Sequence, residues 1–160
     1  MERVNRILKH PQFEYHVKEN QAAEADRRFC CHNMVHFLDV ARIGMILKLE
    51  EGLEIPKEWI YASALLHDTG RHIQYEKGIP HEISSGEIAP EILEECGFSE
   101  EETRVIVDAI LNHRNGEIKE EKSLRGLLYR ADKASRACFA CAAEAECNWK
   151  GERKNLSIKY

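Results

Sequence analysis

Long apolar runs are absent from this chain of 160 residues. No run approaches the roughly 20 residues of a membrane-spanning helix, and the first residues lack the apolar region of a signal peptide. We therefore expect a cytoplasmic protein with no membrane partner. Proline is also scarce, with four residues, and no linker, repeat or low-complexity stretch divides the sequence. These absences predict one domain over residues 1–160, which is long enough to bury a sizeable core.

Blocks of basic residues are missing too. The chain carries 23 Lys and Arg against 28 Asp and Glu, a net charge of −5 with histidine neutral, and its lysines are scattered. This distribution argues against a nucleic-acid partner bound through its phosphate backbone. It allows a small anionic phosphate substrate, because bound divalent ions would reverse the local field. Nothing in the pattern indicates an oligomeric state.

Apolar residues recur with helical rather than alternating spacing in almost every segment. A capping box at Ser99 and a terminator at Gly97 mark two of the helix ends. Gly70 and the segment 78–80 bound an expected loop. No segment predicts a strand, so the expected fold is all-α. The helices are expected over residues 1–9, 12–27, 30–50, 57–68, 81–96, 99–113 and 120–143.

A histidine and an aspartate stand side by side at the end of the apolar helix expected over 57–68. His67 and Asp68 can both reach one metal ion from that position. Further polar residues fall on or beside apolar helical faces, where an unpaired polar group is costly. For any one of them a hydrogen-bonded core residue is the ordinary explanation, but a metal centre satisfies all of them together. Imidazole and carboxylate ligands suit iron, manganese, nickel or zinc. The companions of the doublet are His36, His81, His113 and Asp132.

Three segments resemble the HD-domain metal-dependent phosphohydrolase superfamily. Residues 36–42 (HFLDVAR) are similar to its first-histidine helix, residues 64–71 (ALLHDTGR) to its doublet helix, and residues 128–133 (LYRADK) to its closing aspartate helix. The match covers about residues 30–136, with the motifs in the family's order, and leaves a cysteine-rich extension over 137–160. The resemblance implies a single HD-type helical domain whose ligands are His36, His67, Asp68 and Asp132.

The resemblance extends to the two-metal branch of that superfamily. His81, followed by Gly86 and Ala89, is similar to the third-histidine helix, and residues 110–113 are similar to the fourth-histidine segment. It implies one or two divalent ions (Fe, Mn, Co, Ni or Zn), the second held by His81 and His113 with Asp68 as the bridge. The adjacent histidines and the Gly-Tyr-Pro motif of the cyclic-dinucleotide phosphodiesterases are missing, so cleavage of cyclic dinucleotides is not expected.

Several cations adjoin the proposed ligands. Asp68, Arg71 and Lys133 are the candidate catalytic residues, and Arg71 replaces the family's lysine with a fork suited to phosphate. His32, Arg114 and Arg136 are possible substrate contacts. Solvated surface positions are the alternative for each cation and for His32. The remaining histidines are expected to be structural or solvated: His10, His16 and His72.

Six cysteines are many for a reducing compartment, where stable disulfides are uncommon. Cys138, Cys141 and Cys147 form a Cys-x2-Cys-x5-Cys run whose spacing suits structural zinc or an iron–sulfur cluster. Cys30 or Cys31 is favoured over Cys96 as the fourth ligand, because both precede the helix of His36. Burial of three cysteines on an alanine-rich helix is the alternative.

The sequence therefore predicts an enzyme, a metal-dependent phosphohydrolase that acts on a small phosphate ester, with a nucleotide favoured. Water activated by the metals would attack phosphorus. Two other functions use the same residues. The HD-type fold also hosts diiron oxygenases with a similar set of six ligands, and a non-catalytic module could sense metal or nucleotide at this site.

Overall fold

The computed structural model describes residues 1–160 and contains eight α-helices, four short 3-10 helices and no strand. The expected all-α fold is confirmed. The first four helices are α1 (Glu2–Ile7), α2 (Pro11–Ala23), α3 (Met34–Glu50) and α4 (Lys57–Leu66). The others are α5 (Arg71–Lys77), α6 (His81–Glu95), α7 (Glu100–Asn112) and α8 (Leu124–Ala134). None of them is both long and apolar enough to span a bilayer.

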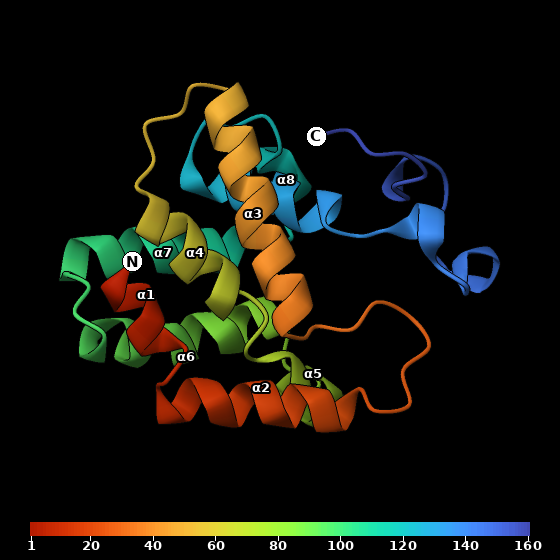
Figure 1. Ribbon diagram of the computed structural model, residues 1–160. Helices are drawn as coiled ribbons and strands as arrows, with labels where there is room; N and C mark the ends of the chain where they lie inside the picture. The colour runs from red at the N-terminus through yellow and green to blue at the C-terminus, as the bar shows by residue number, and fades with distance from the viewer.

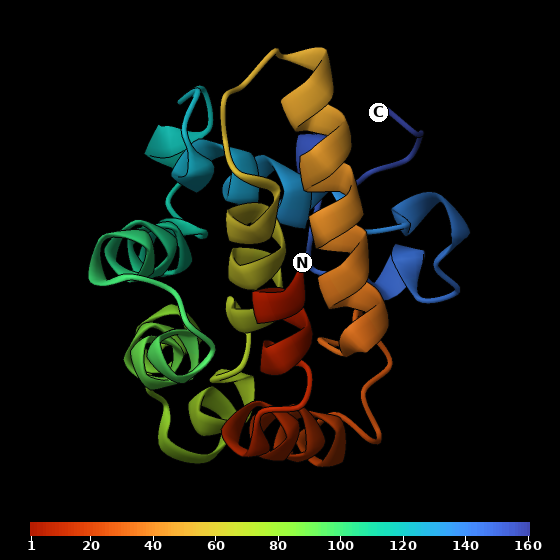
Figure 2. The same cartoon turned by 60° about the vertical axis from the view of Figure 1, so that its left-hand side comes forward.

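Helix α4 lies at the middle of the molecule. It packs against α3 and α8 on one side and against α7 and α6 on the other, an arrangement that Figure 2 shows with α6 and α7 seen nearly end-on. Helices α2 and α5 contact each other at one end of the molecule (Figure 1). The hydrophobic core is one cluster of 27 buried residues, all between Val4 and Ala131. The polar end of α4 therefore meets its neighbours inside the helical body.

Side-chain caps set where the helices around the site begin. The Asn33 side chain accepts hydrogen bonds from the backbone N–H groups of Val35 and His36, so α3 begins at Met34 and not at residue 30. His32 consequently lies in the loop before α3, whereas the helix predicted over residues 30–50 would include it. The capping box expected at Ser99 is present at the start of α7.

The predictions from the sequence were wrong for two segments. Residues 71–77, expected as a loop, form α5, which ends at Gly78 in the left-handed conformation (φ 72°). The last helix, expected over 120–143, covers Leu124–Ala134. It stops because the Asn155 side chain donates to the backbone carbonyls of Lys133 and Arg136, which draws the returning chain against the helix end.

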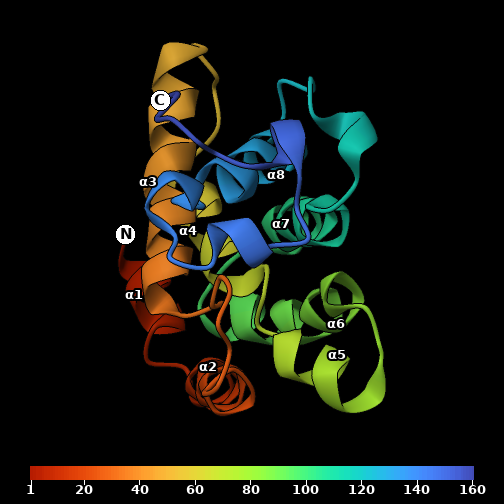
Figure 3. The same cartoon turned by 90° about the vertical axis from the view of Figure 1, so that its right-hand side faces the viewer.

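Residues 137–160 form an extension without an α-helix. Three single-turn 3-10 helices occupy it: Cys138–Ala140, Glu144–Glu146 and Gly151–Arg153. Figure 3 shows the extension lying across the face of the body between α3 and α7. Ala143 is its one buried residue. The cysteines at 138, 141 and 147 therefore do not lie on an alanine-rich helix in the core, which was the alternative explanation for them.

Candidate metal centre

Asp68 lies at the centre of the six residues that the sequence singled out. It follows the end of α4 and is 3% exposed. One carboxylate oxygen, Oδ2, is 3.2 Å from Nε2 of His67 and 3.5 Å from Nε2 of His36. The other, Oδ1, is 3.0 Å from Nε2 of His81 and 3.7 Å from Nε2 of His113. The two oxygens of one carboxylate thus face two separate pairs of histidines.

The first group joins α3, the end of α4 and α8. His36, His67 and Asp68 offer ligand atoms that all lie within 4.8 Å of one another. Asp132 adds Oδ1, which is 3.5 Å from His36 Nε2 and 3.9 Å from His67 Nε2. Two imidazoles and two carboxylates make a set that suits iron, manganese or zinc.

The second group joins Asp68 to the first residue of α6 and to the residue that follows α7. The ligand atoms of Asp68, His81 and His113 also lie within 4.8 Å of one another. The two histidine Nε2 atoms are 3.2 Å apart. The structure therefore brings together all six residues proposed as ligands, from five segments of the chain.

Backbone contacts orient the histidine rings. Nδ1 of His67 donates to the carbonyl of Ala64 at 2.7 Å, and Nδ1 of His113 donates to the carbonyl of Ile110 at 2.6 Å. Each contact spans one turn of a helix at its C-terminal end. A proton fixed on Nδ1 leaves the Nε2 lone pair free for a metal, which is the usual arrangement of metal-binding histidines.

Four polar atoms at the centre are buried without a hydrogen-bond partner. Leaving a buried donor or acceptor unpaired costs about 1–3 kcal/mol each, so four together would be a heavy penalty. Two metal ions that accept lone pairs from these four atoms would remove this penalty. The residues present therefore fit divalent metal ions. The atoms are Nε2 of His36, Nε2 of His67, Oδ1 of Asp68 and Oδ1 of Asp132.

Electrostatics keeps the carboxylates ionised. Burial would raise the pKa of Asp68, but the nearby rings of His67 and His32 hold it well below its ordinary value. Burial likewise opposes the ionisation of Asp132, and the adjacent cations Lys133 and Arg136 still keep its pKa far below the usual range. Both residues can therefore ligate a metal without first losing a proton.

Two residues outside the ligand set fix the turn that carries Asp68. The fully buried side chain of Asn20, on α2, donates to the backbone carbonyl of Asp68 at 2.8 Å and accepts from the backbone N–H of His72 at 2.7 Å. Gly70 lies so close to α6 that a Cβ there would be 2.5 Å from the Cβ of Ser84. Asn20 was missed by sequence reasoning, because nothing near it in the sequence marks its contact with the doublet 48 residues away.

His32 is a buried residue of the site and not a surface residue. Its Nδ1 is 2.6 Å from Oε1 of Glu24, which also accepts from Tyr75 at 2.6 Å. The other ring nitrogen, Nε2, points to the centre and is 3.9 Å from Asp68 Oδ2. Burial opposes the ionisation of Glu24, but its bonds from His32 and Tyr75 lower the pKa to about 2. A charged carboxylate therefore holds His32 with Nε2 facing the pocket.

A cavity of about 150 Å³ opens beside the two groups. Four cations line it together with His32 and Trp149: Arg71, Arg114, Lys133 and Arg136. Lys133 contacts Asp132 at 2.5 Å, and Arg114 pairs with Glu82 at 3.1 Å. All four cations predicted as catalytic or substrate-contacting residues thus meet at one pocket.

The extension closes part of this pocket with an aromatic residue that sequence reasoning missed. The Arg136 guanidinium lies 3.9 Å above the ring of Trp149, a cation–π contact. A larger cavity of about 910 Å³ adjoins, sharing Arg114, Lys133 and Trp149 with the first. Its further basic lining residues are Lys119, Arg130, Arg153 and Lys159. Glu120 and Glu152 line it too, so cations outnumber carboxylates in this cavity although the whole chain is acidic.

The cysteines divide into two sets. Cys30, Cys31, Cys138, Cys141 and Cys147 line one cavity, whereas Cys96 is buried at the end of α6 in the core. His36 and Ser135 line the same cavity. The other histidines are structural, as expected: Nδ1 of His10 caps α2, and Nδ1 of His16 is 2.9 Å from Nε2 of His72.

Fold and site define an all-helical protein with a buried histidine–aspartate centre suited to divalent metal ions. Comparison with known families agrees: the HD domain profile matches residues 34–147. The chain belongs to the HD domain family, whose members are mostly metal-dependent hydrolases. The matched range extends past residue 136 and includes the three cysteines of the extension.

A relative from Clostridium beijerinckii is 49% identical over 160 residues and covers the whole of both chains. It is described as an uncharacterized protein, so it brings no activity to the comparison. No solved structure matches this chain.

Proposed function

We propose that this protein is a metal-dependent phosphohydrolase that acts on a small phosphate ester, with a nucleotide as the favoured substrate. The observation that carries the proposal is the position of Asp68, whose two oxygens face the pairs His36/His67 and His81/His113. A carboxylate so placed can bridge two ions. His36, His67 and Asp132 would complete the first site, and His81 and His113 the second.

Divalent ions held there supply Lewis acidity toward phosphoryl oxygens and lower the pKa of water toward neutrality. The protein's own part is to hold the phosphate and to manage protons. Lys133 and Arg136 line the pocket from α8 and the residues after it, whereas Arg71 comes from α5 and Arg114 from the loop after α7. Cations around a phosphate stabilise the negative charge that spreads over its oxygens as the ester bond breaks.

The contacts of Arg71 make it a specific candidate for binding the phosphate. No carboxylate pairs with it, and its Nη1 lies 2.6 Å from Nδ1 of His81. Gln74 Oε1 lies 2.5 Å from the same His81 nitrogen, Nδ1, and can accept a hydrogen bond from it. When Nδ1 donates to Gln74, it cannot also accept from Arg71, so Nη1 of Arg71 is free for a bound anion while its Nε donates to the Tyr75 hydroxyl at 3.1 Å.

His32 is placed to carry a proton. Its Nδ1–H donates to Glu24, so Nε2 bears a lone pair directed into the pocket. At that atom it can take a proton from water or return one to the leaving oxygen. The adjoining basic cavity of about 910 Å³ supports a substrate larger than a bare phosphate, such as a nucleotide with further phosphate groups.

The test is a turnover screen of mononucleotides, dinucleotides and dinucleoside polyphosphates with manganese, iron, cobalt, nickel and zinc in turn. Arg71→Ala should reduce kcat/KM about 10- to 100-fold with unchanged metal content. Arg104→Ala, an exposed arginine on α7, is the matched control and should be silent. If a fully metallated protein hydrolyses no phosphate ester, the proposal is wrong. Oxygen consumption by the iron form would then identify the diiron oxygenase, and binding without turnover the sensing module.

A further inference from the structure

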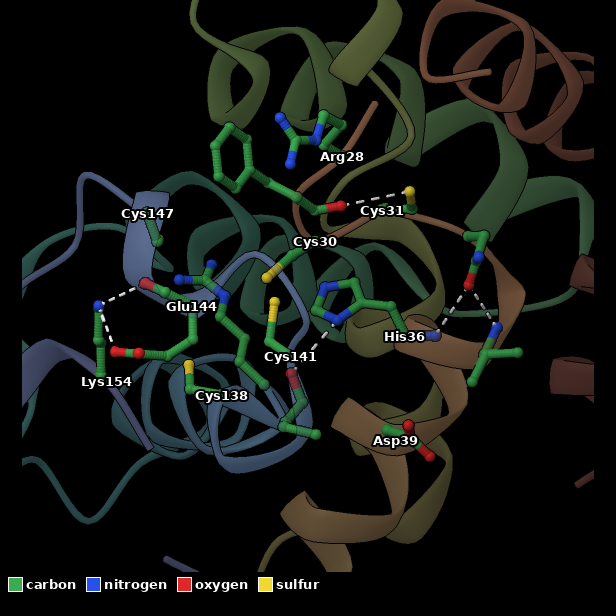
Figure 4. Close-up of a pocket in the computed structure, with 16 residues that line it drawn as sticks. Arg28, Cys30, Cys31, His36, Asp39, Cys138, Cys141, Glu144, Cys147 and Lys154 are labelled. Atoms are coloured by element: carbon green, nitrogen blue, oxygen red, sulfur yellow. Dashed lines mark hydrogen bonds and ion pairs between the residues drawn. The ribbon is translucent and has the colours of Figure 1, made fainter. Parts of the chain in front are cut away.

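Four cysteines from two distant parts of the chain face one cavity beside the metal centre. Cys30 comes from the loop between α2 and α3, and Cys138, Cys141 and Cys147 come from the extension. The cavity measures about 400 Å³. Figure 4 shows the sulfur atoms of Cys30, Cys138 and Cys141 directed to its interior, and Cys147 lines the cavity as well.

The structure separates Cys30 from its neighbour Cys31. The Sγ of Cys31 is directed away from the other cysteines and donates to the backbone carbonyl of Phe29 at 3.5 Å (Figure 4). Cys96 lies in the core, 1% exposed. Cys30 is therefore the fourth member of the set, a choice that the sequence left open.

These cysteines are not ordinary core residues. Cys30 is exposed and the other three are half-buried, although free cysteine is usually among the most buried residue types. They also lie where a stabilising element is needed, because residues 137–160 bury a single side chain, Ala143. A segment with so little core is usually held by disulfides or by a metal group, and all six cysteines are free thiols.

The spacing of the sulfur atoms contradicts the single structural zinc ion that the sequence pattern suggested. Four thiolates on one zinc ion, with Zn–S bonds of about 2.3 Å, lie about 3.8 Å apart. The histidine and aspartate ligands form groups within 4.8 Å, but no three cysteine sulfurs form such a group. A four-iron, four-sulfide cluster binds each thiolate to a different iron and so holds the four cysteine sulfurs further apart than one zinc ion does.

The cavity carries three cations against two carboxylates. Arg28, Arg136 and Lys154 line it with Asp39 and Glu144, and Arg28 and Lys154 are paired with Glu146 and Glu144. Positive charge at this position stabilises thiolates and the net negative charge of a cluster that four thiolates bind.

We propose that Cys30, Cys138, Cys141 and Cys147 bind a four-iron, four-sulfide cluster that fixes the extension to the body. The cluster would share a wall with the His/Asp centre, since His36 lines the cavity and its Nδ1 lies 3.2 Å from Oγ of Ser135. Its ligands are nevertheless separate from those of the centre. The inference therefore does not rest on the phosphohydrolase proposal.

The test is the iron and acid-labile sulfide content of the full chain, produced with iron and sulfur in supply and purified without oxygen. About four sulfides per chain are expected, with the Mössbauer signature of thiolate-bound iron. Sulfide is specific to the cluster, because histidine and aspartate bind iron without it. His81→Ala should therefore lower the metal content of the His/Asp centre and leave the sulfide unchanged, which separates this proposal from the previous one.

Single Cys→Ser variants assign the ligands. Cys30→Ser, Cys138→Ser, Cys141→Ser and Cys147→Ser should each lose most of the sulfide, whereas the matched controls Cys31→Ser and Cys96→Ser should keep it. Equal loss in Cys31→Ser and Cys30→Ser would overturn the assignment. Zinc without sulfide at these cysteines, or a native protein without sulfide, would overturn the cluster itself. The measurement on the native protein decides the point even if a variant fails to fold.

Discussion

The helical body and the extension hold their chemically active residues in different ways. In the body, a core of 27 buried residues positions the ends of α4 and α7, so His67, Asp68 and His113 are fixed by packing and by backbone hydrogen bonds. The extension, which carries three cysteines, buries a single side chain and is held by polar contacts such as those of Asn155 and Lys154. The body can therefore prepare its metal centre before any ion binds. The extension has little core of its own, so we expect it to depend on the proposed cluster.

The strongest way to test this contrast is to remove the bridge of the body's centre. Asp68→Ala should abolish binding at both metal sites and reduce phosphate-ester hydrolysis about 1,000-fold or more, since the metals contribute several kcal/mol to the transition state. Helicity should change little, because the core that packs α4 remains. Metal analysis, circular dichroism and turnover check this prediction, with Asp26→Ala, an exposed carboxylate, as the control. Undiminished metal content in Asp68→Ala would refute the ligand assignment.

A smaller effect is expected at the residue that orients His32. Glu24→Gln keeps the size of the side chain but removes the negative charge from the group that accepts the hydrogen bond of His32 Nδ1. We expect kcat to fall about 10- to 100-fold, within the range for general acid–base groups. KM and metal content should stay close to those of the native protein. A loss of metal or of fold with no separate effect on kcat would mean that the Glu24–His32 pair is structural.

Loss of one cysteine should loosen the extension and leave the helical body unchanged. Cys141→Ser should leave the metal content of the His/Asp centre intact and raise the rate of limited chymotryptic cleavage at the exposed Phe139 at least about tenfold, which corresponds to about 1.4 kcal/mol of local stability. Mass spectrometry locates the cut. Cys96→Ser serves as control for the loss of a thiol. Unchanged cleavage in Cys141→Ser would show that the extension is held by its other contacts, such as Asn155 with the end of α8.

The smallest predicted effect concerns the body alone and acts through pH. Burial, followed by the nearby His72, lowers the pKa of His16 from 6.5 to about 4. Between these two values the unfolded chain binds a proton at His16 that the folded protein does not bind, so the free energy of unfolding falls as the pH drops from 6.5 toward 4. Allowing for the water that reaches His16, the loss is on the order of 1 kcal/mol.

Urea unfolding across that pH range measures this loss. His16→Gln should flatten the profile, whereas Lys18→Gln, an exposed position on the same helix, should not. A profile of His16→Gln that parallels that of the native protein would contradict the assignment to His16.

The sequence predicts much of the body, because helical periodicity and the order of ligands are local features. The His67–Asp68 doublet, the capping box of Ser99 and the convergence of Arg71 and Lys133 on one pocket all appear in the structure. Some of the misses depend on contacts between distant residues. Helix α8 ends early because Asn155 binds its last carbonyls from 19 to 22 residues away, and the end of a helix set in this way leaves no local signal.

Prediction of the site from the sequence is limited in the same way, by contacts between distant residues. Asn20 holds the turn of Asp68 from another helix, and Glu24 orients His32 through a hydrogen bond that helical periodicity does not mark. Trp149 reaches the pocket from the extension, where periodicity predicts nothing. In each case the side chain type is compatible with an ordinary surface position, and the fold alone gives it a role.

The central claim is that one carboxylate, that of Asp68, serves two ions. Anomalous diffraction from crystals of the manganese-loaded native protein tests it most directly. The account predicts two peaks about 3.5–4 Å apart, one beside His36, His67 and Asp132 and the other beside His81 and His113, with Asp68 between them. A single peak, or a second peak that Asp68 does not contact, would contradict the account.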